Sequence, residues 1–574
     1  MERERNVAGT TKATKQGDWV REAADQVIAE AERRGGKPLV CASGISPSGR
    51  IHLGNLREVM VPHFVADELR RRGLECRHIL SWDDYDRLRK VPAGVEDPES
   101  FAQHVGKPLT AVPDPCGQHA SWAEHFKEPF RAALRALGVE IEEISQTEMY
   151  AAGAYREQIV LAMTERARID GVLGRYRTAK KAAPVGADGE EIESEAEGDD
   201  ERAVGAGYYP FKPYCSVCQR DLTTITSYDE TTFIADYTCA CGHADAVDVR
   251  EGGVGKLVWK VDWPMRWAFE GVTFEAGGVD HSSPGSSFTV GSQLVREIFG
   301  GQPPSYLGYS FVGISGSAKM SSSKGGAPTP TDALEILEAP LLRWVYARRK
   351  PSQAITVAFD QEINRVYDEW DALGRKIADD AAAPLETAVY ARSAGTATQT
   401  LPATPVPLPF RTLASVVDVT TGDEQQMLRI LRDMGESDES RLESLDPARP
   451  RLDRAEAWVL GYLPAEERTH VRTEPDTERL AALSATQHEA LKLLLDGLDT
   501  HWSLPALTSL LYGVPKLQAG LELDAPASPE LKVAQRELFA LLYLLLVGRD
   551  TGPRLPTLLL ALGQERIRRL LAAG

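Results

Sequence analysis

Two short segments that lie far apart in the chain constrain its fold most strongly. The first is Ser46-Pro47-Ser48-Gly49-Arg50-Ile51-His52-Leu53-Gly54-Asn55, between an apolar run and a helical pattern, and the second is Lys319-Met320-Ser321-Ser322-Ser323-Lys324-Gly325. A helix start presents N–H groups to a phosphate, and a lysine-containing loop adds positive charge. The pair therefore predicts that two distant parts of the chain fold together around one polyphosphate.

The residues around the first segment predict a parallel sheet. Residues 37–42 indicate a buried strand, 53–72 a helix and 75–82 a second strand, with acidic residues at 83–86. Parallel sheets bind ligands beyond the carboxyl ends of their strands, and both the glycine loop and the acidic cluster fall at that edge. Three further strands are expected to resume the sheet at 256–263, 277–281 and 306–312. We therefore predict an α/β, Rossmann-type fold that is split by a long insertion.

The chain of 574 residues is too long for one core, so several units are expected. Helical spacing of apolar residues predicts helices at 18–34, 121–180, 331–347, 361–382 and through 410–574. The units expected in chain order are 1–36 (N-terminal helical segment), 37–150 (first half of the sheet domain), 151–255 (insertion, with an acidic loop at 185–203 and a Cys-rich module at 208–249), 256–313 (second half), 314–382 (helical junction carrying the second segment), 383–409 (linker or loop) and 410–574 (all-helical domain).

Two tight cysteine pairs in a short β-rich segment predict a metal site. Cys215-x2-Cys218 is followed by Cys239-x-Cys241, and His243 stands close by. Four thiolates suit a structural Zn2+, although His243 can replace Cys241 because C-x-C is a tight bite. Free buried thiols are the alternative interpretation. The remaining cysteines are expected to be packing residues: Cys41, Cys76 and Cys116.

The net charge of −19 does not exclude a nucleic-acid partner, because nine carboxylates are concentrated between residues 188 and 201. Basic groups at 70–72, 175–181 and 566–569 can supply parts of a positive track. The longest apolar run, residues 538–547, is too short to span a bilayer. The charged N-terminus has no apolar core of a secretory signal, and metal-spaced thiols suit a reducing compartment, so a cytoplasmic protein without membrane association is expected.

The chain resembles the class I lysyl-tRNA synthetases, which are related in architecture to the glutamyl enzymes. The segments that carry the resemblance are 46–55, 83–92, 260–267, 277–281 and 319–324, together with 546–553 and 562–567 near the C-terminus. The resemblance implies a split Rossmann-type catalytic domain, a zinc-containing insertion that holds the acceptor end of tRNA, and a helical anticodon-binding domain. It covers nearly all of the chain except the acidic loop and the first residues.

The resemblance also implies site residues. His52 and Asn55 fall on the two histidine positions of the H-I-G-H signature, and Lys319, Ser321 and Lys324 fall on the K-M-S-K-S loop, whose fourth position here is Ser322. The division of labour between Lys319 and Lys324 stays open. The implied catalytic residues are His52, Asn55, Lys319 and Lys324. The implied ATP-binding residues are Ser46, Pro47, Gly49, His52, Gly54, Asn55, Lys319, Met320, Ser321 and Ser322.

The amino-acid pocket is expected to be acidic and aromatic. Glutamyl enzymes carry an arginine at the position of Ala42, and without a cation there a buried substrate carboxylate would be unpaired. A carboxylate beside an aromatic face suits an ammonium group. By resemblance Asp83 would take the α-amino group, whereas the partner of the ε-ammonium stays open. The alternative interpretations are that Asp84 caps the next helix and that Trp263 belongs to the core. The expected lysine pocket comprises Gly44, Asp83, Asp84, Trp263, Asp280 and His281.

The expected reaction is two-step aminoacylation. Lysine attacks ATP, which is bound with Mg2+, and the resulting lysyl-adenylate acylates the terminal adenosine of tRNA(Lys). No protein nucleophile is needed, because positioning and electrostatics carry both steps. The expected partners are therefore tRNA(Lys), L-lysine and ATP, and the expected state is a monomer. The alternatives are a class I synthetase of glutamyl type and a non-catalytic tRNA-binding paralogue.

Overall fold

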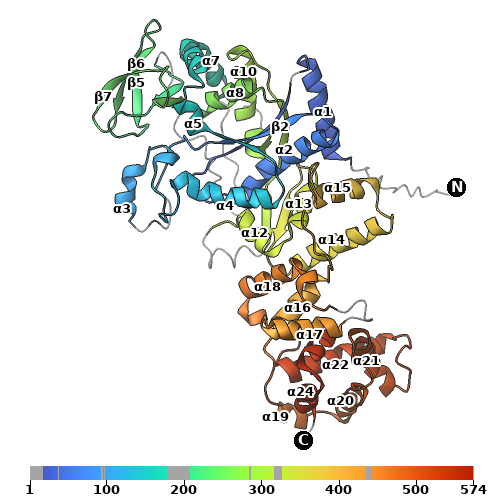
Figure 1. The fold of residues 1–574 in the computed structure, drawn as a ribbon. Helices are drawn as coiled ribbons and strands as arrows, with labels where there is room; N and C mark the ends of the chain where they lie inside the picture. The colour runs from blue at the N-terminus through green and yellow to red at the C-terminus, as the bar shows by residue number, and fades with distance from the viewer. Residues whose placement is uncertain are drawn as a thin grey trace, which may run out of the picture.

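A five-stranded parallel sheet forms the centre of the larger lobe (Figure 1). The strands lie in the order β10-β9-β1-β2-β3, and every pairing is parallel. Their bounds are β1 (Leu39–Ile45), β2 (Cys76–Trp82), β3 (Glu142–Ser145), β9 (Phe274–Gly278) and β10 (Ser305–Tyr309). The residues that the computed structural model describes are 17–36, 38–91, 95, 97–177, 207–282, 286–315, 326–434 and 442–572.

The strand order changes direction between β1 and β9. The chain builds β2 and β3 on one side of β1, leaves the sheet, and returns on the other side as β9 and β10. The predicted sheet and its interruption are thereby confirmed. In open parallel sheets this point creates a crevice beyond the carboxyl ends of the strands, where ligands bind.

The predicted elements around the first segment are confirmed. The β1 sequence LVCASGI is almost wholly buried, as expected for a strand covered on both faces. Helices α1 (Trp19–Arg33) and α2 (Leu53–Arg71) match the predicted helices at 18–34 and 53–72. Both bury apolar residues in the main core.

The strand prediction for residues 256–263 is wrong. Only a short strand, β8 (Gly255–Leu257), pairs with β4 (Phe211–Pro213), and helix α8 (Trp259–Glu270) begins directly after it. Three tryptophans recur at a spacing of four residues, which places them on one helix face. The strand expected at 277–281 also shifts, because β9 ends at Gly278 and α9 (Val279–Ser282) follows.

The remaining differences between the predicted and the observed elements are short strands and helices, which the sequence patterns on either side of them obscure. The region predicted as helical at 121–180 contains the edge strand β3, and the linker predicted at 383–409 begins with helix α15 (Pro384–Ala394). Strand β12 (Ile355–Ala358) was also missed. The helices of the first region and insertion are α3 (Pro98–Phe101), α4 (Trp122–Ala136), α5 (Gln146–Ala151), α6 (Arg156–Thr164) and α7 (Arg166–Arg177), and α10 (Ser287–Glu297) follows in the second half of the sheet domain.

The insertion carries a small antiparallel sheet at the outer edge of the larger lobe (Figure 1). Its strands are β5 (Thr223–Tyr228), β6 (Ile234–Cys239) and β7 (Ala244–Asp248). An apolar core separate from the main one joins this module to the helices α6, α7, α8 and α10. The predicted β-rich character of the module is confirmed.

A helical junction connects the sheet to the C-terminal lobe. Strand β11 (Val312–Ser315) leaves the main sheet and pairs in parallel with β12. The junction helices are α12 (Pro330–Ile336), α13 (Ala339–Ala347) and α14 (Ile363–Ala378). One continuous apolar core runs from α2 through these helices into the C-terminal helices.

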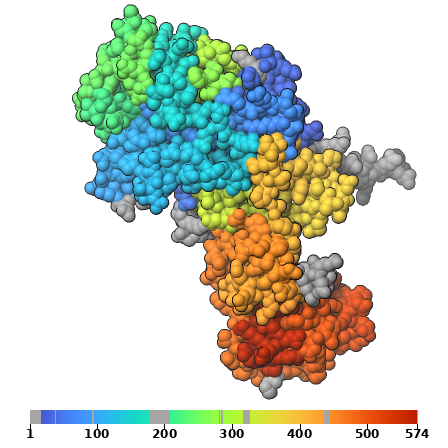
Figure 2. All heavy atoms as spheres, viewed as in Figure 1, coloured from blue at the N-terminus to red at the C-terminus, as the bar shows by residue number. Residues whose placement is uncertain are grey.

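The C-terminal region forms a second lobe at the end of the molecule opposite the insertion (Figure 2). Within its described residues, 410–434 and 442–572, it contains helices and no strand, as predicted. None of the described helices combines the length and apolar character that a membrane span needs. The helices are α16 (Phe410–Thr420), α17 (Glu424–Asp433), α18 (Arg451–Gly461), α19 (Thr477–Ala481), α20 (Ala485–Gly497), α21 (Leu504–Gln518), α22 (Pro529–Val547), α23 (Leu555–Leu562) and α24 (Gln564–Leu571).

A buried ionic cluster fastens α18 to the junction. Arg451 Nε donates to Glu338 Oε2 (2.8 Å) and its Nη1 donates to Asp371 Oδ2 (3.0 Å). Glu338 also accepts from Thr404 Oγ1 (2.7 Å). The side chains of Arg451 and Glu338 are almost inaccessible to solvent. The guanidinium therefore fixes the approach of α18 to the start of α13 and to α14.

Replacing Arg451 with Met should lower the free energy of unfolding by about 3–5 kcal/mol, because two largely buried carboxylates lose their cation. Urea unfolding followed by circular dichroism measures the change. Arg411→Met is the matched control, since Arg411 pairs with Asp368 at 3.0 Å but both side chains are half exposed. Its expected cost is about 0–1 kcal/mol. Equal losses in the two variants would contradict the assignment.

Candidate functional site

A cleft of about 1370 Å3 opens beyond the carboxyl ends of the central strands. The end of β1 and the first turn of α2 form one wall. The connection from β10 into β11, together with residues 327–328, forms another part of the wall, and residues of α8 and β9 also line the cleft. The cleft thus lies at the change of strand direction, where the parallel sheet predicts a ligand.

His52 is the N-cap residue of α2, and its ring holds the first turn. Nδ1 accepts hydrogen bonds from the backbone N–H groups of Gly54 (3.0 Å) and Asn55 (3.3 Å). Asn55 Oδ1 accepts in return from the N–H of His52 (3.0 Å). Because Nδ1 is an acceptor, the neutral ring carries its proton on Nε2. His52 is exposed and lines the cleft.

The expectation that the start of α2 offers amide groups to a phosphate is wrong for this structure. Two of these N–H groups bond to the His52 ring, and the N–H of Leu53 donates to Pro328 O (2.9 Å). Gly54 is needed for the cap. A Cβ at this position would lie 2.7 Å from Cε1 of the His52 ring, so the cap itself requires glycine.

The loop between β1 and α2 is held by an indole and by an ion pair between Arg50 and Asp332 (3.3 Å). Trp122 Nε1, at the start of α4, donates to Ser48 O (2.9 Å). Of the residues predicted here, Gly44, Ser46 and Gly49 line the cleft. Pro47 is buried and is not among the lining residues.

The second signature segment, residues 319–325, lies outside the described residues, and with it the predicted site residues Lys319, Met320, Ser321, Ser322 and Lys324. The described residues on either side of it do reach the cleft. Val312 and Ile314 of β11 line it before the segment, and Ala327 and Pro328 line it afterwards. The hydrogen bond from Leu53 to Pro328 ties the chain after the segment to the start of α2.

The two neighbouring aspartates after β2 lie in different environments. Asp83 lines the cleft and accepts from Arg266 Nη1 (2.7 Å), and burial raises its pKa to about 6. Asp84 is buried and does not line the cleft. It accepts from Lys127 Nζ (2.6 Å) and from the N–H of Thr147 (2.8 Å) in the first turn of α5. This geometry separates Asp84 from the predicted lysine pocket and gives it a structural contact.

An aromatic wall forms where α8 meets the cleft. Trp259 and Trp263 stack with ring centroids 5.1 Å apart, and His281 lies 5.6 Å from Trp259 and 6.1 Å from Trp263. The structure therefore brings together Trp263 and His281, two residues of the predicted lysine pocket. Trp259 was not predicted as a pocket residue. The side chain of Asp280 lies outside the described part of the structure.

Glu275, in the middle of β9, is a cleft residue that the sequence did not reveal. Its carboxylate is only 5% exposed. It accepts from Trp263 Nε1 (3.0 Å) and from Trp267 Nε1. Burial raises its pKa to about 7. In the described residues no lysine or arginine lies within ion-pair distance of this carboxylate.

Comparison with known proteins identifies the family. Residues 17–396 match the family described as tRNA synthetases class I (K). The chain belongs to this family. It is 59% identical to a lysine--tRNA ligase of Streptomyces coelicolor, over 98% of this chain and 99% of that one. It is 34% identical to a lysine--tRNA ligase of Pyrococcus horikoshii, over 97% and 99%. A solved glutamate tRNA ligase from Elizabethkingia meningosepticum aligns over 93% of this chain and 98% of that one, at 12% identity and a TM-score of 0.40.

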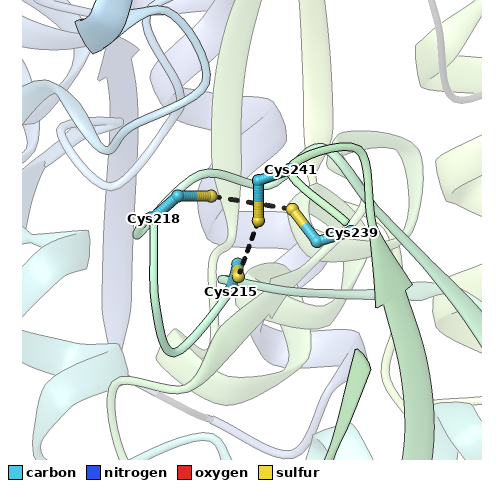
Figure 3. A group of neighbouring side chains, drawn as sticks. All are labelled: Cys215, Cys218, Cys239 and Cys241. Carbon is cyan, nitrogen blue, oxygen red and sulfur yellow. Dashed lines mark hydrogen bonds between the residues drawn. The ribbon is translucent and has the colours of Figure 1, made fainter. Parts of the chain in front are cut away.

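The cysteine module of this synthetase brings four sulfur atoms together (Figure 3). Cys215 Sγ lies 3.8 Å from Cys241 Sγ, and Cys218 Sγ lies 3.6 Å from Cys239 Sγ. Sulfurs at the corners of a Zn2+ tetrahedron are about 3.8 Å apart, since each Zn–S bond is about 2.3 Å. His243 is outside the group, because its Nε2 contacts Ser216 Oγ (3.1 Å) and Asp245 Oδ2 (3.4 Å). The four cysteines therefore fit zinc without the histidine.

A second group of possible metal ligands lies in the loop before α4 and in the first turn of that helix. Asp114, Cys116, His119 and His125 place their ligand atoms within 4.8 Å of one another. Cys116 Sγ is 3.4 Å from Nδ1 of each histidine. The prediction that Cys116 is a packing residue is wrong, since it is exposed and grouped with these donors. The spacing D-x-C-x2-H-x5-H was the overlooked signal.

Replacing Asp84 with Asn should lower the apparent melting temperature, because the buried Lys127 loses one of its two carboxylate partners and keeps only Glu124 at 2.8 Å. We expect a destabilisation of about 1–3 kcal/mol with an unchanged KM for the amino acid. Asp83→Asn is the comparison variant and should raise that KM. Melting curves and steady-state kinetics measure the two effects. If the Asp84 variant is fully folded and its KM for the amino acid is raised, Asp84 is part of the amino-acid pocket and the structural assignment is wrong.

Proposed function

We propose that the chain is a lysine--tRNA ligase that activates L-lysine with ATP and transfers it to the terminal adenosine of tRNA(Lys). Two near-full-length relatives carry the name lysine--tRNA ligase, which supports the reaction class. The observation that carries the choice of amino acid is Glu275, a buried carboxylate that lines the cleft and needs a cation.

The pocket around Glu275 suits a long side chain with a terminal ammonium group. Ala42 and Glu275 are register partners in the parallel pair β1–β9, so their side chains share one face of the sheet. The small Ala42 leaves room beside the carboxylate. The indole face of Trp263 can pack on methylene groups and attract a cation. A glutamate side chain here would instead bring a third carboxylate beside Glu275 and Asp83, which argues against a glutamyl enzyme.

On this proposal the α-amino group meets Asp83 and the ATP phosphates meet His52 Nε2. The donor on Nε2 would stabilise charge that develops on the α-phosphate during attack. Asn55 holds the ring through the cap, and Lys319 and Lys324 would supply charge from the second segment. Mg2+ would enter with ATP. The described side chains then act by binding and orientation, without a protein nucleophile.

The remaining partners follow from the same proposal. The zinc-bound insertion would hold the acceptor end of tRNA, and the C-terminal helical lobe would contact the anticodon end. We propose a cytoplasmic monomer. The separation of the two lobes in Figure 2 suits a ligand as extended as tRNA.

The test is ATP–pyrophosphate exchange with each amino acid in turn. Lysine should support exchange, and glutamate should not. Glu275→Gln should raise the KM for lysine by about 10- to 100-fold, because it removes a charge-assisted contact of about 1.5–3 kcal/mol. The variant keeps the side-chain volume and one of the two acceptor oxygens, and it lies in the amino-acid part of the cleft, so its KM for ATP should stay unchanged. Exchange that depends on glutamate, or none with any amino acid, would refute the function.

The lysine KM should also rise as the pH falls below about 7. Burial raises the pKa of Glu275 to about 7, so its carboxylate takes a proton in this range and loses its attraction for the ammonium group. In Glu275→Gln the rise should begin only near pH 6, where Asp83 gains its proton. An identical profile in the two proteins would exclude Glu275 as the partner of the ammonium group.

Metal analysis tests the two ligand groups. We propose Zn2+ at the four cysteines and a second ion at the Asp114 group, so the protein should contain two equivalents. Cys218→Ser and Cys116→Ser should each lose one equivalent and lower the melting temperature. Cys76→Ser is the control, because Cys76 belongs to neither ligand group, its sulfur lies 3.8 Å from Cys41, and its replacement should leave the metal content unchanged. A zinc-free protein of normal stability would rule out the structural role.

A further inference from the structure

Arg57 is a buried cation in α2, little more than one turn after His52. Its side chain is 1% exposed. Among the described residues it has no carboxylate partner; its hydrogen-bond acceptors are all backbone carbonyl groups. Burial lowers the pKa of Arg57, yet the group stays charged because its ordinary value is so high. Burying a charge without a counter-ion costs free energy, so Arg57 is expected to have a role beyond packing.

The guanidinium joins two segments that are distant in sequence. Nη1 donates to Ser310 O (2.7 Å) and Phe311 O (3.3 Å). Nη2 donates to Pro351 O (2.9 Å) and Gln353 O (2.9 Å). The N–H of Ser310 also donates to Pro351 O (2.9 Å), so the two segments touch at the point where Arg57 holds them.

These segments lead into the two strands of the small parallel sheet. Residues 310–311 come directly before β11, and residues 351–353 come shortly before β12. The β11 residues Val312 and Ile314 form part of the wall of the same cleft that His52 lines. One side chain therefore sets the position of this wall relative to the first turn of α2.

We propose that Arg57 is a positioning residue that fixes the spacing of the two walls between which ATP binds; this inference rests on the proposed function. The planar guanidinium directs its N–H groups in a rigid fork, which matches four carbonyl groups from two directions. A lysine ammonium keeps the charge but has neither the fork nor the reach. Arg57 touches no reacting atom and acts through the backbone of residues 310–311.

The amino-acid side of the cleft does not depend on this contact. Glu275, Trp263 and Asp83 belong to β9, α8 and the end of β2, and none of the carbonyl groups that Arg57 holds lies in these elements. A change at Arg57 should therefore affect ATP and spare lysine. Generalised loosening of the protein would affect both substrates.

The experiment compares Arg57→Lys with Arg343→Lys in lysine-dependent pyrophosphate exchange. Arg343 is an equally buried arginine whose guanidinium also holds carbonyl groups, those of Leu137 (2.7 Å) and Arg392 (2.7 Å), and it does not line the cleft. Melting curves of both variants set a temperature at which each is folded. Arg57→Gln, which keeps a planar donor without charge, provides a second variant of the same site.

The Arg57 variants should lower kcat/KM for ATP by about 10- to 100-fold, because misplacing a wall by a fraction of an ångström disrupts the attack geometry. Their KM for lysine, and both constants of Arg343→Lys, should stay within about twofold of the parent. Equal losses for ATP and lysine, or equal losses in the Arg57 and Arg343 variants, would overturn the proposal. Failure of the proposed function would appear separately, as wild-type exchange with another amino acid or with none.

Discussion

The pairing of β1 with β9 is the contact on which the rest of the site depends. These strands come from the two sides of the long insertion, and they meet through Cys41–Phe274 and Ala42–Glu275. The backbone of Val40 is fixed to Thr273 by hydrogen bonds in both directions, each of 2.9 Å. Because β2 and β3 extend the sheet one way and β10 the other, this junction creates the crevice. It also sets Glu275 opposite a small residue, which gives the cleft its depth.

Buried charge is handled differently in different parts of the molecule. Asp84 with Lys127, and Arg451 with Glu338 and Asp371, are ion pairs that fasten elements together. The charges of Arg57 and Arg343 are instead stabilised by the dipoles of backbone carbonyl groups. Such hydrogen bonds hold backbone segments in place. Within the described part of the chain, the hydrogen-bond donors to Glu275 are two indoles and no ion pair is formed, so its carboxylate can still attract a cationic ligand.

The sequence predicted the sheet, the position of His52 and the cysteine group because each rests on local spacing. The apolar run of β1 and the glycine loop before α2 are short-range signals, and four cysteines at metal spacing admit few structures. The strand predicted at residues 256–263 is wrong because a short apolar run fits a strand or a helix equally well, and the tryptophan spacing was overlooked.

The role of Glu275 could not be predicted from the residues next to it in the sequence. The environment of its carboxylate depends on Ala42, which is distant in sequence, and on indoles of helix α8, whose first residues the sequence predicts as a strand. Asp84 and Asp83 look alike in sequence, and only tertiary contacts separate them.

The hydrogen bonds from Trp263 and Trp267 to one carboxylate have a consequence for spectroscopy. The emission of an indole responds to the electric field across its rings, and here two indoles share the negative charge of Glu275. A cation that arrives at this carboxylate changes the field on both at once. The protein thereby carries an intrinsic optical reporter of pocket occupancy, in the part of the cleft where no dye could be attached without filling it.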